Sequence, residues 1–384
     1  MPTDILLTRC GLARAPGLDA HALRRALAHL GADSPLLGTD ISVLTTLGIR
    51  PATARALHYP DRRQIEADRQ LVEREQWTVL SADDPQYPSR LLELAHPPAI
   101  LFVAGDVSLL HAAQLAIVGS RHPTANGRLT ARDFACYFAS LGLVITSGLA
   151  LGIDAAGHDG ALAATNGRTI AVCGTGLDVC YPAEHRRLAE RILAQGGALV
   201  SEFPPGTPPR PAHFPQRNRL ISGLSLGVLV VEAAARSGSL ATARCAAEQG
   251  REVFAVPGSI HSPQSRGCHA LLRQGAVLVE NADDVLSELK IPIENQLVGI
   301  PSHSPNPFAD GRSRLDNPGE ILLDALGFEP TSLDALIAST GLSSTSVASL
   351  LLALELEGRV ASDAAGRYFR LAGLPELAAD RTDS

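Results

Sequence analysis

Lysine is almost absent from this chain, because Lys290 is the only lysine among 33 basic residues. Nearly all positive charge is therefore arginine, whose rigid fork of donors suits phosphate oxygens. The composition of the genome explains the same bias more simply. The net charge of -7 over 384 residues excludes a protein that is basic over its whole surface, as many nucleic-acid binders are. Any nucleic-acid site must be a local basic patch on an acidic body.

Paired cysteines and apolar spans are also missing. No two of the six cysteines are spaced as CxxC, and Cys173 and Cys180 are too far apart for the usual zinc spacing. We expect reduced, mostly buried thiols, no metal and no other cofactor. The N-terminus has no apolar signal core, and serine, threonine and glycine interrupt the uncharged stretch 135–153. We therefore expect a cytoplasmic protein without a membrane partner.

Short apolar runs alternate with helix-length segments between residues 112 and 289. This alternation predicts an α/β fold, an extended Rossmann-like domain with a mostly parallel sheet buried on both faces. Ligands of such sheets bind at the carboxyl ends of the strands. The expected strands are 115–118, 143–146, 169–172, 198–200, 226–231, 253–255 and 276–279.

The flanking segments differ in composition. Residues 1–72 predict a small helical domain of the SAM or helix-hairpin-helix kind, in which Leu47-Gly48-Ile49 resembles a hairpin; a helical bundle without DNA contact is the simpler interpretation. Residues 73–290 form the sheet domain. Residues 291–316 are rich in Pro, Ser and Asn and predict a linker. Residues 317–373 predict three helices and a hairpin, the outline of a winged helix, before a tail at 374–384.

Three consecutive expected strands end in turns of small residues. The first turn is Gly119-Ser120-Arg121, the second is Ser147-Gly148, and the third contains Gly174 and Gly176. We expect their amides to form a shallow ledge for an extended phosphate chain, with Arg121 as a fixed charge. Arg121 in a structural ion pair is the alternative.

Two further segments complete the expected site. In "HFPQRNRLISGLS", Phe214 offers a stacking surface, and Arg217 and Arg219 bracket Asn218. Stacking combined with arginine–phosphate contacts is how single strands are held without sequence preference. The alternative is that one or both arginines form structural salt bridges. Ser237, followed by Gly238, is the expected N-cap of the next helix and a further anion site.

Asp154 and His158 lie four residues apart and share a helix face. Acid–base chemistry is one interpretation. A structural pair that orders the strand-end loops is the interpretation we favour.

The motifs "AIVGSRHPT", "ITSGLALGIDAAGH", "GTGLD..YP", "SEFPPGTPP" and "FPQRNRLISGLS" occur in the order found in the DNA-processing protein A (DprA/Smf) family, which residues 115–279 closely resemble. The resemblance implies a DNA-binding protein rather than an enzyme, with no catalytic residue. It implies capture and protection of single-stranded DNA in natural transformation, loading of the RecA recombinase, and a homodimer formed through the Rossmann-like domain. The implied DNA-binding residues are Gly119, Ser120, Arg121, Ser147, Gly148, Gly174, Gly176, Phe214, Gln216, Arg217, Asn218, Arg219, Ser237 and Gly238.

Two features depart from the family pattern, and the charge of the winged helix is unusual for a DNA reader. Gln216 stands where many members have a basic residue, and Cys268-His269 replaces a small polar residue and an asparagine. The expected winged helix carries eight acidic residues between 316 and 371 against Arg359, Arg367 and Arg370. A major-groove reader needs phosphate anchors, so we expect a protein-interaction or weak DNA role for this domain.

Other functions were weighed against this one. A nicotinamide dehydrogenase is rejected because the first turn lacks GxGxxG and the second strand lacks an acidic end. A Rossmann-like nucleotide phosphoribohydrolase remains the alternative, since Glu232 and Ser237-Gly238-Ser239 match its carboxylate and phosphate loop, although PGGxGT is absent. A purely architectural adaptor with a vestigial ledge is the third possibility.

Overall fold

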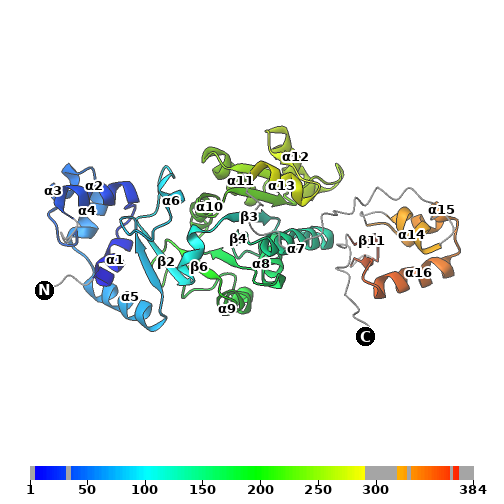
Figure 1. The fold of residues 1–384 in the computed structure, drawn as a ribbon, viewed down its shortest axis with the longest axis horizontal. Helices are drawn as coiled ribbons and strands as arrows, with labels where there is room; N and C mark the ends of the chain where they lie inside the picture. The colour runs from blue at the N-terminus through cyan, green and yellow to red at the C-terminus, as the bar shows by residue number, and fades with distance from the viewer. Residues whose placement is uncertain (1–4, 32–35, 290–317, 327–329, 364–365, 372–384) are drawn as a thin grey trace, which may run out of the picture. The chain divides into compact units, whose positions relative to one another are not determined.

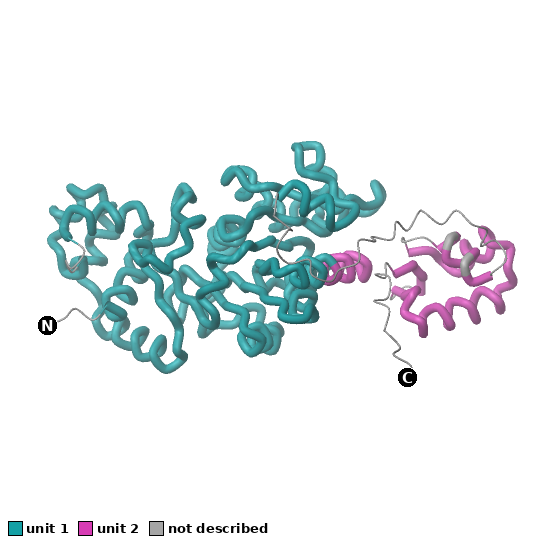
Figure 2. The backbone as a smooth tube through the Cα atoms, viewed as in Figure 1, with its two compact units in different colours: residues 1–123, 134–291 teal, residues 124–133, 292–384 magenta. Residues whose placement is uncertain are grey.

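The computed structural model describes residues 5–31, 36–289, 318–326, 330–363 and 366–371. The chain divides into two compact units, residues 1–123 with 134–291 and residues 124–133 with 292–384 (Figure 2). The expected linker at 291–316 and the tail at 374–384 lie outside the described residues.

Helices begin the first unit (Figure 1). They are α1 (Ile5–Ala13), α2 (Ala20–Leu30), α3 (Ile41–Thr46), α4 (Pro51–His58) and α5 (Arg62–Arg74). Asp19, Asp40 and Asp61 cap α2, α3 and α5 by accepting backbone N–H groups, which explains where these helices start. Gly48, at a φ of 79°, forms the turn between α3 and α4. Its N–H donates to the Thr45 carbonyl at 3.0 Å, so this amide is already used within the turn.

A nine-stranded sheet occupies the centre of the first unit in the order β1-β2-β6-β5-β4-β3-β7-β8-β9. Its strands are β1 (Thr78–Ser81), β2 (Ile100–Gly105), β3 (Gln114–Gly119), β4 (Val144–Ser147), β5 (Thr169–Val172), β6 (Ala198–Ser201), β7 (Gly227–Val231), β8 (Glu252–Ala255) and β9 (Val277–Leu278). The strands from β6 to β9 in this order are all parallel. The parallel sheet and its seven expected strands are confirmed.

Two strands were not expected. β2 pairs antiparallel with both β1 and β6, and thereby extends the parallel sheet toward the N-terminal helices. The sequence prediction that started the sheet at residue 112 was therefore too short. The pairing matters for position, because β2 lies next to β6 and β1, which follows α5, forms the edge of the sheet beyond β2.

Helices cover both faces of the sheet (Figure 1). They are α6 (Ser89–Leu92), α7 (Ala125–Ser140), α8 (Ile153–Ala163), α9 (Arg186–Ala194), α10 (His213–Leu224), α11 (Ser239–Glu248), α12 (Arg266–Arg273) and α13 (Ala282–Leu289). Short 3-10 turns occur at Val107–His111, Ala183–His185 and Pro263–Ser265. Fully buried Leu115, Ile145 and Val230 show why the strands are continuous apolar runs. Cys10 and Cys268 are buried and the other four cysteines are partly exposed, fewer buried than expected.

The described part of the second unit includes α14 (Pro318–Leu326), α15 (Leu333–Thr340), α16 (Ser344–Leu356) and a hairpin of β10 (Val360–Ser362) with β11 (Tyr368–Arg370). Leu322, Leu336 and Leu351 form its core. The predicted winged-helix outline is confirmed. Among the described residues no single helix is long and apolar enough to cross a membrane, and one bent pair, α15 with α16 at 112°, passes on length and composition alone.

Candidate functional site

The strand-end turns lie at the carboxyl edge of β3, β4 and β5, because these strands are parallel neighbours. At Gly119 a Cβ atom would lie 1.9 Å from the Val231 carbonyl oxygen, so only glycine fits there. The Ser120 N–H donates to the Glu232 carbonyl at 2.7 Å, and the Ser120 carbonyl accepts from Ile153 at 3.0 Å. The first turn is therefore fixed by internal hydrogen bonds.

The amides of the other two turns are also largely used. Asp154 accepts hydrogen bonds from the N–H groups of Gly148 at 3.1 Å and Ala150 at 3.3 Å. The Gly176 N–H donates to the Thr207 carbonyl at 3.0 Å. The expectation of a ledge lined with available amides was wrong at Ser120, Gly148 and Gly176. Ligand contacts at this edge therefore depend on side chains.

Exposed Arg121 and Tyr181 and half-buried Phe214 form a group that we call the rim. The Arg121 guanidinium carbon lies 5.8 Å from the centre of the Phe214 ring, and the Tyr181 ring lies 5.3 Å from the same ring at 43°. Gly174 permits this arrangement, because a Cβ there would lie 3.2 Å from the Phe214 ring. The rim joins a fixed cation to aromatic faces, the combination that holds phosphates and bases together.

Sequence reasoning missed Tyr181, although it lies in the quoted motif after β5. It is 45% exposed and packs against Phe214. Arg210 before α10 and Arg236 before α11 were also missed. Both are exposed in segments that follow β6 and β7 at the same edge of the sheet. An arginine in the loop after a parallel strand was the signal that could have found them.

Arg217 does not belong to the exposed rim. It is 4% exposed, and its Nη1 donates to the Val172 carbonyl at 2.9 Å. A Cβ on Gly148 would lie 1.7 Å from that same nitrogen, so Arg217 fills the space that this glycine leaves. Burial lowers the pKa of Arg217, while the charge of Asp154 opposes that shift. The expectation that Arg217 faces phosphate is therefore corrected, because the buried Arg217 guanidinium packs against Gly148 of the second turn.

Arg219 forms a structural salt bridge, which was the alternative to a phosphate contact. Its guanidinium pairs with the carboxylate of Glu202 and donates to the His96 carbonyl at 2.7 Å. Burial raises the pKa of Glu202, and hydrogen bonds from Gln216 and Arg219 oppose this rise. Gln216 itself is exposed. Arg219 and Gln216 thus lie on the other side of α10 from Phe214.

The segment after β7 differs slightly from the expectation. The helix α11 starts at Ser239, with Gly238 rather than Ser237 as its N-cap. The hydroxyl groups of Ser237 and Ser239 lie 2.7 Å apart, and the Asn218 amide donates to the Gly238 carbonyl at 3.4 Å. A Cβ on Gly238 would meet open space. These contacts place Asn218, Ser237 and Gly238 side by side.

Asp154, His158 and Arg217 form a buried group that we call the support layer. Burial raises the pKa of Asp154 and lowers that of His158 to about 3. His158 Nδ1 lies 2.7 Å from the Thr169 hydroxyl, which itself donates to Ile145, so the imidazole is the donor. Ser147 is also buried and donates to the Ile117 carbonyl. The favoured interpretation of Asp154 as an organiser of the strand-end loop agrees with its hydrogen bonds.

Metal ligation has no support within the described ranges, where no group of three or more His, Cys, Asp or Glu side chains is arranged to hold an ion.

Comparison with protein-family models gives two matches. The DNA recombination-mediator protein A model matches residues 78–290, and the DprA winged helix domain model matches residues 306–366. The Protein Smf of Escherichia coli K12 is 44% identical over 346 residues, which cover 90% of each chain. The DNA processing protein DprA of Bacillus subtilis is 47% identical over 205 residues, 53% of this chain and 68% of that protein.

Solved structures give a consistent result. The crystal structure of DNA processing protein A from Streptococcus pneumoniae matches with a TM-score of 0.63 and 38% identity, over 72% of this chain and 95% of that one. DNA processing protein A from Helicobacter pylori, described for its single-stranded DNA binding mode, matches with a TM-score of 0.51 and 31% identity, over 56% and 96%.

Proposed function

The chain belongs to the DNA recombination-mediator protein A family, and on that premise we propose that it captures single-stranded DNA at the rim. One observation carries the proposal: the exposed Arg121 guanidinium lies 5.8 Å over the Phe214 ring, with Tyr181 beside it. A strand crossing the rim places a phosphate at the guanidinium and a base on the aromatic faces. The single-stranded DNA binding for which the Helicobacter pylori protein is described supports single strands as the ligand.

The remaining predicted residues divide by role in this proposal. Gly119, Gly148 and Gly174 let backbone and side chains approach closely enough to shape the edge, and Ser120, Ser147 and Gly176 fix the turns by internal hydrogen bonds. Asn218, Ser237 and Gly238 form the neighbouring wall. The exposed arginines Arg210 and Arg236 add phosphate anchors at the same edge.

The cellular role follows the family. We assign to this chain the protection of incoming single strands in natural transformation and assistance in loading RecA, in the cytoplasm. A homodimer through the Rossmann-like domain 73–290 aligns two rims on one strand and raises affinity without new contacts. The helical domain at 1–72 and the domain at 317–373 flank this unit. α16 contains no basic residue and exposes Leu352 and Leu356, which supports a protein-binding role for the winged helix.

The proposed function includes no catalysis. Asp154, the carboxylate weighed with His158 for acid–base chemistry, already accepts two backbone hydrogen bonds. His158 is completely buried and donates to Thr169, away from the exposed rim. A phosphoribohydrolase is the alternative, and incubation of the pure protein with nucleoside monophosphates tests it. We expect no release of base.

The binding proposal is tested by fluorescence anisotropy with single-stranded and double-stranded oligonucleotides over a salt series. We expect salt-sensitive binding that prefers single strands. Arg121→Ala weakens it several-fold and reduces the magnitude of the salt slope by about 0.7, because one phosphate contact is lost.

Arg63→Ala is the matched control, because Arg63 is an exposed arginine on α5, outside the rim. Its binding should equal that of the wild type. Equal affinity of wild type and Arg121→Ala would remove Arg121 from the site and return the rim to the nucleotide-enzyme alternative.

A further inference from the structure

A cleft of about 650 Å³ lies within the first unit, between the N-terminal helices and the sheet. Its size falls in the range of about 300–1,000 Å³ typical of ligand sites. Its walls come from residues 12–19 after α1, Arg25 of α2, the turn 48–50, the segment 96–100 before β2, residues 202–204 after β6, and Gln216 and Arg219 of α10.

The charges of this cleft do not cancel. Its carboxylates are both occupied: Asp19 accepts the Ala22 N–H at 2.7 Å as the cap of α2, and Glu202 pairs with Arg219. The lining holds three arginines, Arg25, Arg50 and Arg219, against these two carboxylates, which leaves an excess of one positive charge, and Arg25 and Arg50 are exposed. An anion is therefore the favoured occupant.

Arg25 and Arg50 lie around one turn of the backbone. The position of a Cβ on Gly48 would be 3.8 Å from Nη2 of Arg25, which places that guanidinium beside the turn. Arg50, two residues later, donates from Nη2 to the Gly17 carbonyl at 2.7 Å, and this bond holds it at the cleft wall. Both guanidinium groups therefore lie beside the turn at 48–50, and a guanidinium fork suits phosphate oxygens.

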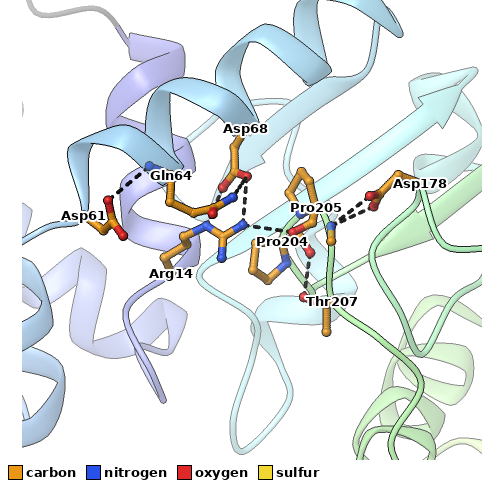
Figure 3. Close-up of polar contacts among 9 residues, drawn as sticks. Arg14, Asp61, Gln64, Asp68, Asp178, Pro204, Pro205 and Thr207 are labelled. Carbon is orange, nitrogen blue, oxygen red and sulfur yellow. Dashed lines mark hydrogen bonds and ion pairs between the residues drawn. The ribbon is translucent and has the colours of Figure 1, made fainter.

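The loop after β6, which carries part of the cleft wall, is fixed to its neighbours by polar contacts (Figure 3). Arg14 pairs with both carboxylate oxygens of Asp68 on α5, at 2.5 and 2.8 Å, and donates to the Pro205 carbonyl at 2.9 Å. The next residue, Gly206, donates its N–H to the carboxylate of Asp178, in the third strand-end turn. The wall formed by the loop 203–207 is thus fixed to the N-terminal helices and to the ledge. A preformed site loses less entropy on binding.

The first turn of α10 connects this cleft to the rim. Phe214 faces the rim, whereas Gln216, two residues later, lines the cleft. Resting on the proposed function, we propose that the cleft binds the phosphates of nucleotides that flank those held at the rim, on the same DNA strand. Arg25 and Arg50 are the anchors of this extension, and the strand reaches them by crossing α10 at Gln216.

The test compares oligonucleotides of about 4 and about 16 nucleotides, the range of single-strand site sizes. The full chain is used, with Arg25→Ala/Arg50→Ala as the variant. We expect affinity for the long oligonucleotide to fall fivefold or more and its salt slope to shrink by about 1.4, because two phosphate contacts are lost. Affinity for the short oligonucleotide stays unchanged.

Arg24→Ala/Arg63→Ala is the matched control, since these arginines are exposed on the N-terminal helices α2 and α5 but do not line the cleft. It should bind both lengths like the wild type. Equal losses for both lengths, or the same loss in the control, would overturn the extension. Arg121→Ala separates this failure from that of the proposed function, because it weakens binding of both lengths if the rim is the primary site.

Arg50 also bonds to Gly17, so folding of the double variant is checked by thermal unfolding. Arg25→Ala alone is the second variant and removes one anchor. It should reduce the salt slope for the long oligonucleotide by about 0.7. A slope identical to the wild type in a folded Arg25→Ala protein contradicts the proposal.

Discussion

The rim and the support layer each contain an arginine, which is exposed in the rim and buried in the support layer. Arg121 is exposed over Phe214, whereas Arg217 is buried beneath the second turn, three residues along the same helix from that phenylalanine. The exposed guanidinium is available to a ligand. The buried guanidinium donates a hydrogen bond to the Val172 carbonyl and interacts electrostatically with Asp154. The burial of an arginine, more than its residue type, therefore decides whether it is available to a ligand or supports the fold.

The largest expected effect is on folding. Arg217→Ala removes a buried side chain, its hydrogen bond to the Val172 carbonyl and the volume that it fills beside Gly148, and such a large-to-small change at a buried site costs about 2–5 kcal/mol. Urea unfolding measures it. Asp154→Asn/Arg217→Met, which removes both charges and keeps the volume, should recover part of the loss. A folded, fully stable Arg217→Ala protein that fails to bind single strands would move Arg217 into the rim and break the comparison.

A smaller effect concerns pH. Burial lowers the pKa of His158 from 6.5 to about 3. Between pH 3 and pH 6.5 this histidine is therefore protonated in the unfolded chain and neutral in the folded chain. Its contribution to stability is complete above pH 6.5 and is lost as the pH falls toward 3. By pH 5 the loss is about 2 kcal/mol.

His158→Asn is the comparison for this effect, since the asparagine amide can still donate to Thr169. The difference in unfolding free energy between pH 7 and pH 5 should shrink in this variant by about the same amount. The raised pKa of Asp154 acts in the opposite direction but is common to both proteins. An unchanged pH dependence would show that His158 is not the buried neutral group described.

The smallest effect belongs to the rim. Phe214→Ala removes a stacking surface, worth about 1–3 kcal/mol per base, so single-strand affinity should fall roughly tenfold. Phe214→Tyr, which keeps an aromatic face, is the control and should bind within a few-fold of the wild type. Anisotropy measures both. A Phe214→Ala protein that binds normally but unfolds more easily would place this ring in the support layer.

Much of the fold was predictable because parallel strands are buried on both faces. β3, β5 and β7 are uninterrupted apolar runs, and each was found within a residue or two. Ile100–Gly105 carries the same signal and could have been found. Its pairing could not, because an antiparallel contact with β6 joins residues about a hundred positions apart and no local pattern encodes it.

The site was predictable as a region and less so residue by residue. The motifs located the turns, and Arg121 and Phe214 do lie together. Arg217 and Arg219 could not be sorted from the sequence, because their fates depend on distant partners: Val172 for one and Glu202 for the other. The carbonyls of Glu232 and Thr207, which accept hydrogen bonds from the Ser120 and Gly176 amides, are likewise distant from them in the sequence. Tyr181 was within reach as an aromatic residue in a strand-end motif.

The space shared by Gly148 and Arg217 also constrains how this sequence can change over generations. A side chain at position 148 would overlap the guanidinium, since its Cβ would lie 1.7 Å from Nη1. A substitution at 148 therefore requires the guanidinium to move, and the guanidinium then gives up its hydrogen bond to the Val172 carbonyl. Related sequences that differ at 148 are accordingly expected to differ at 217 as well.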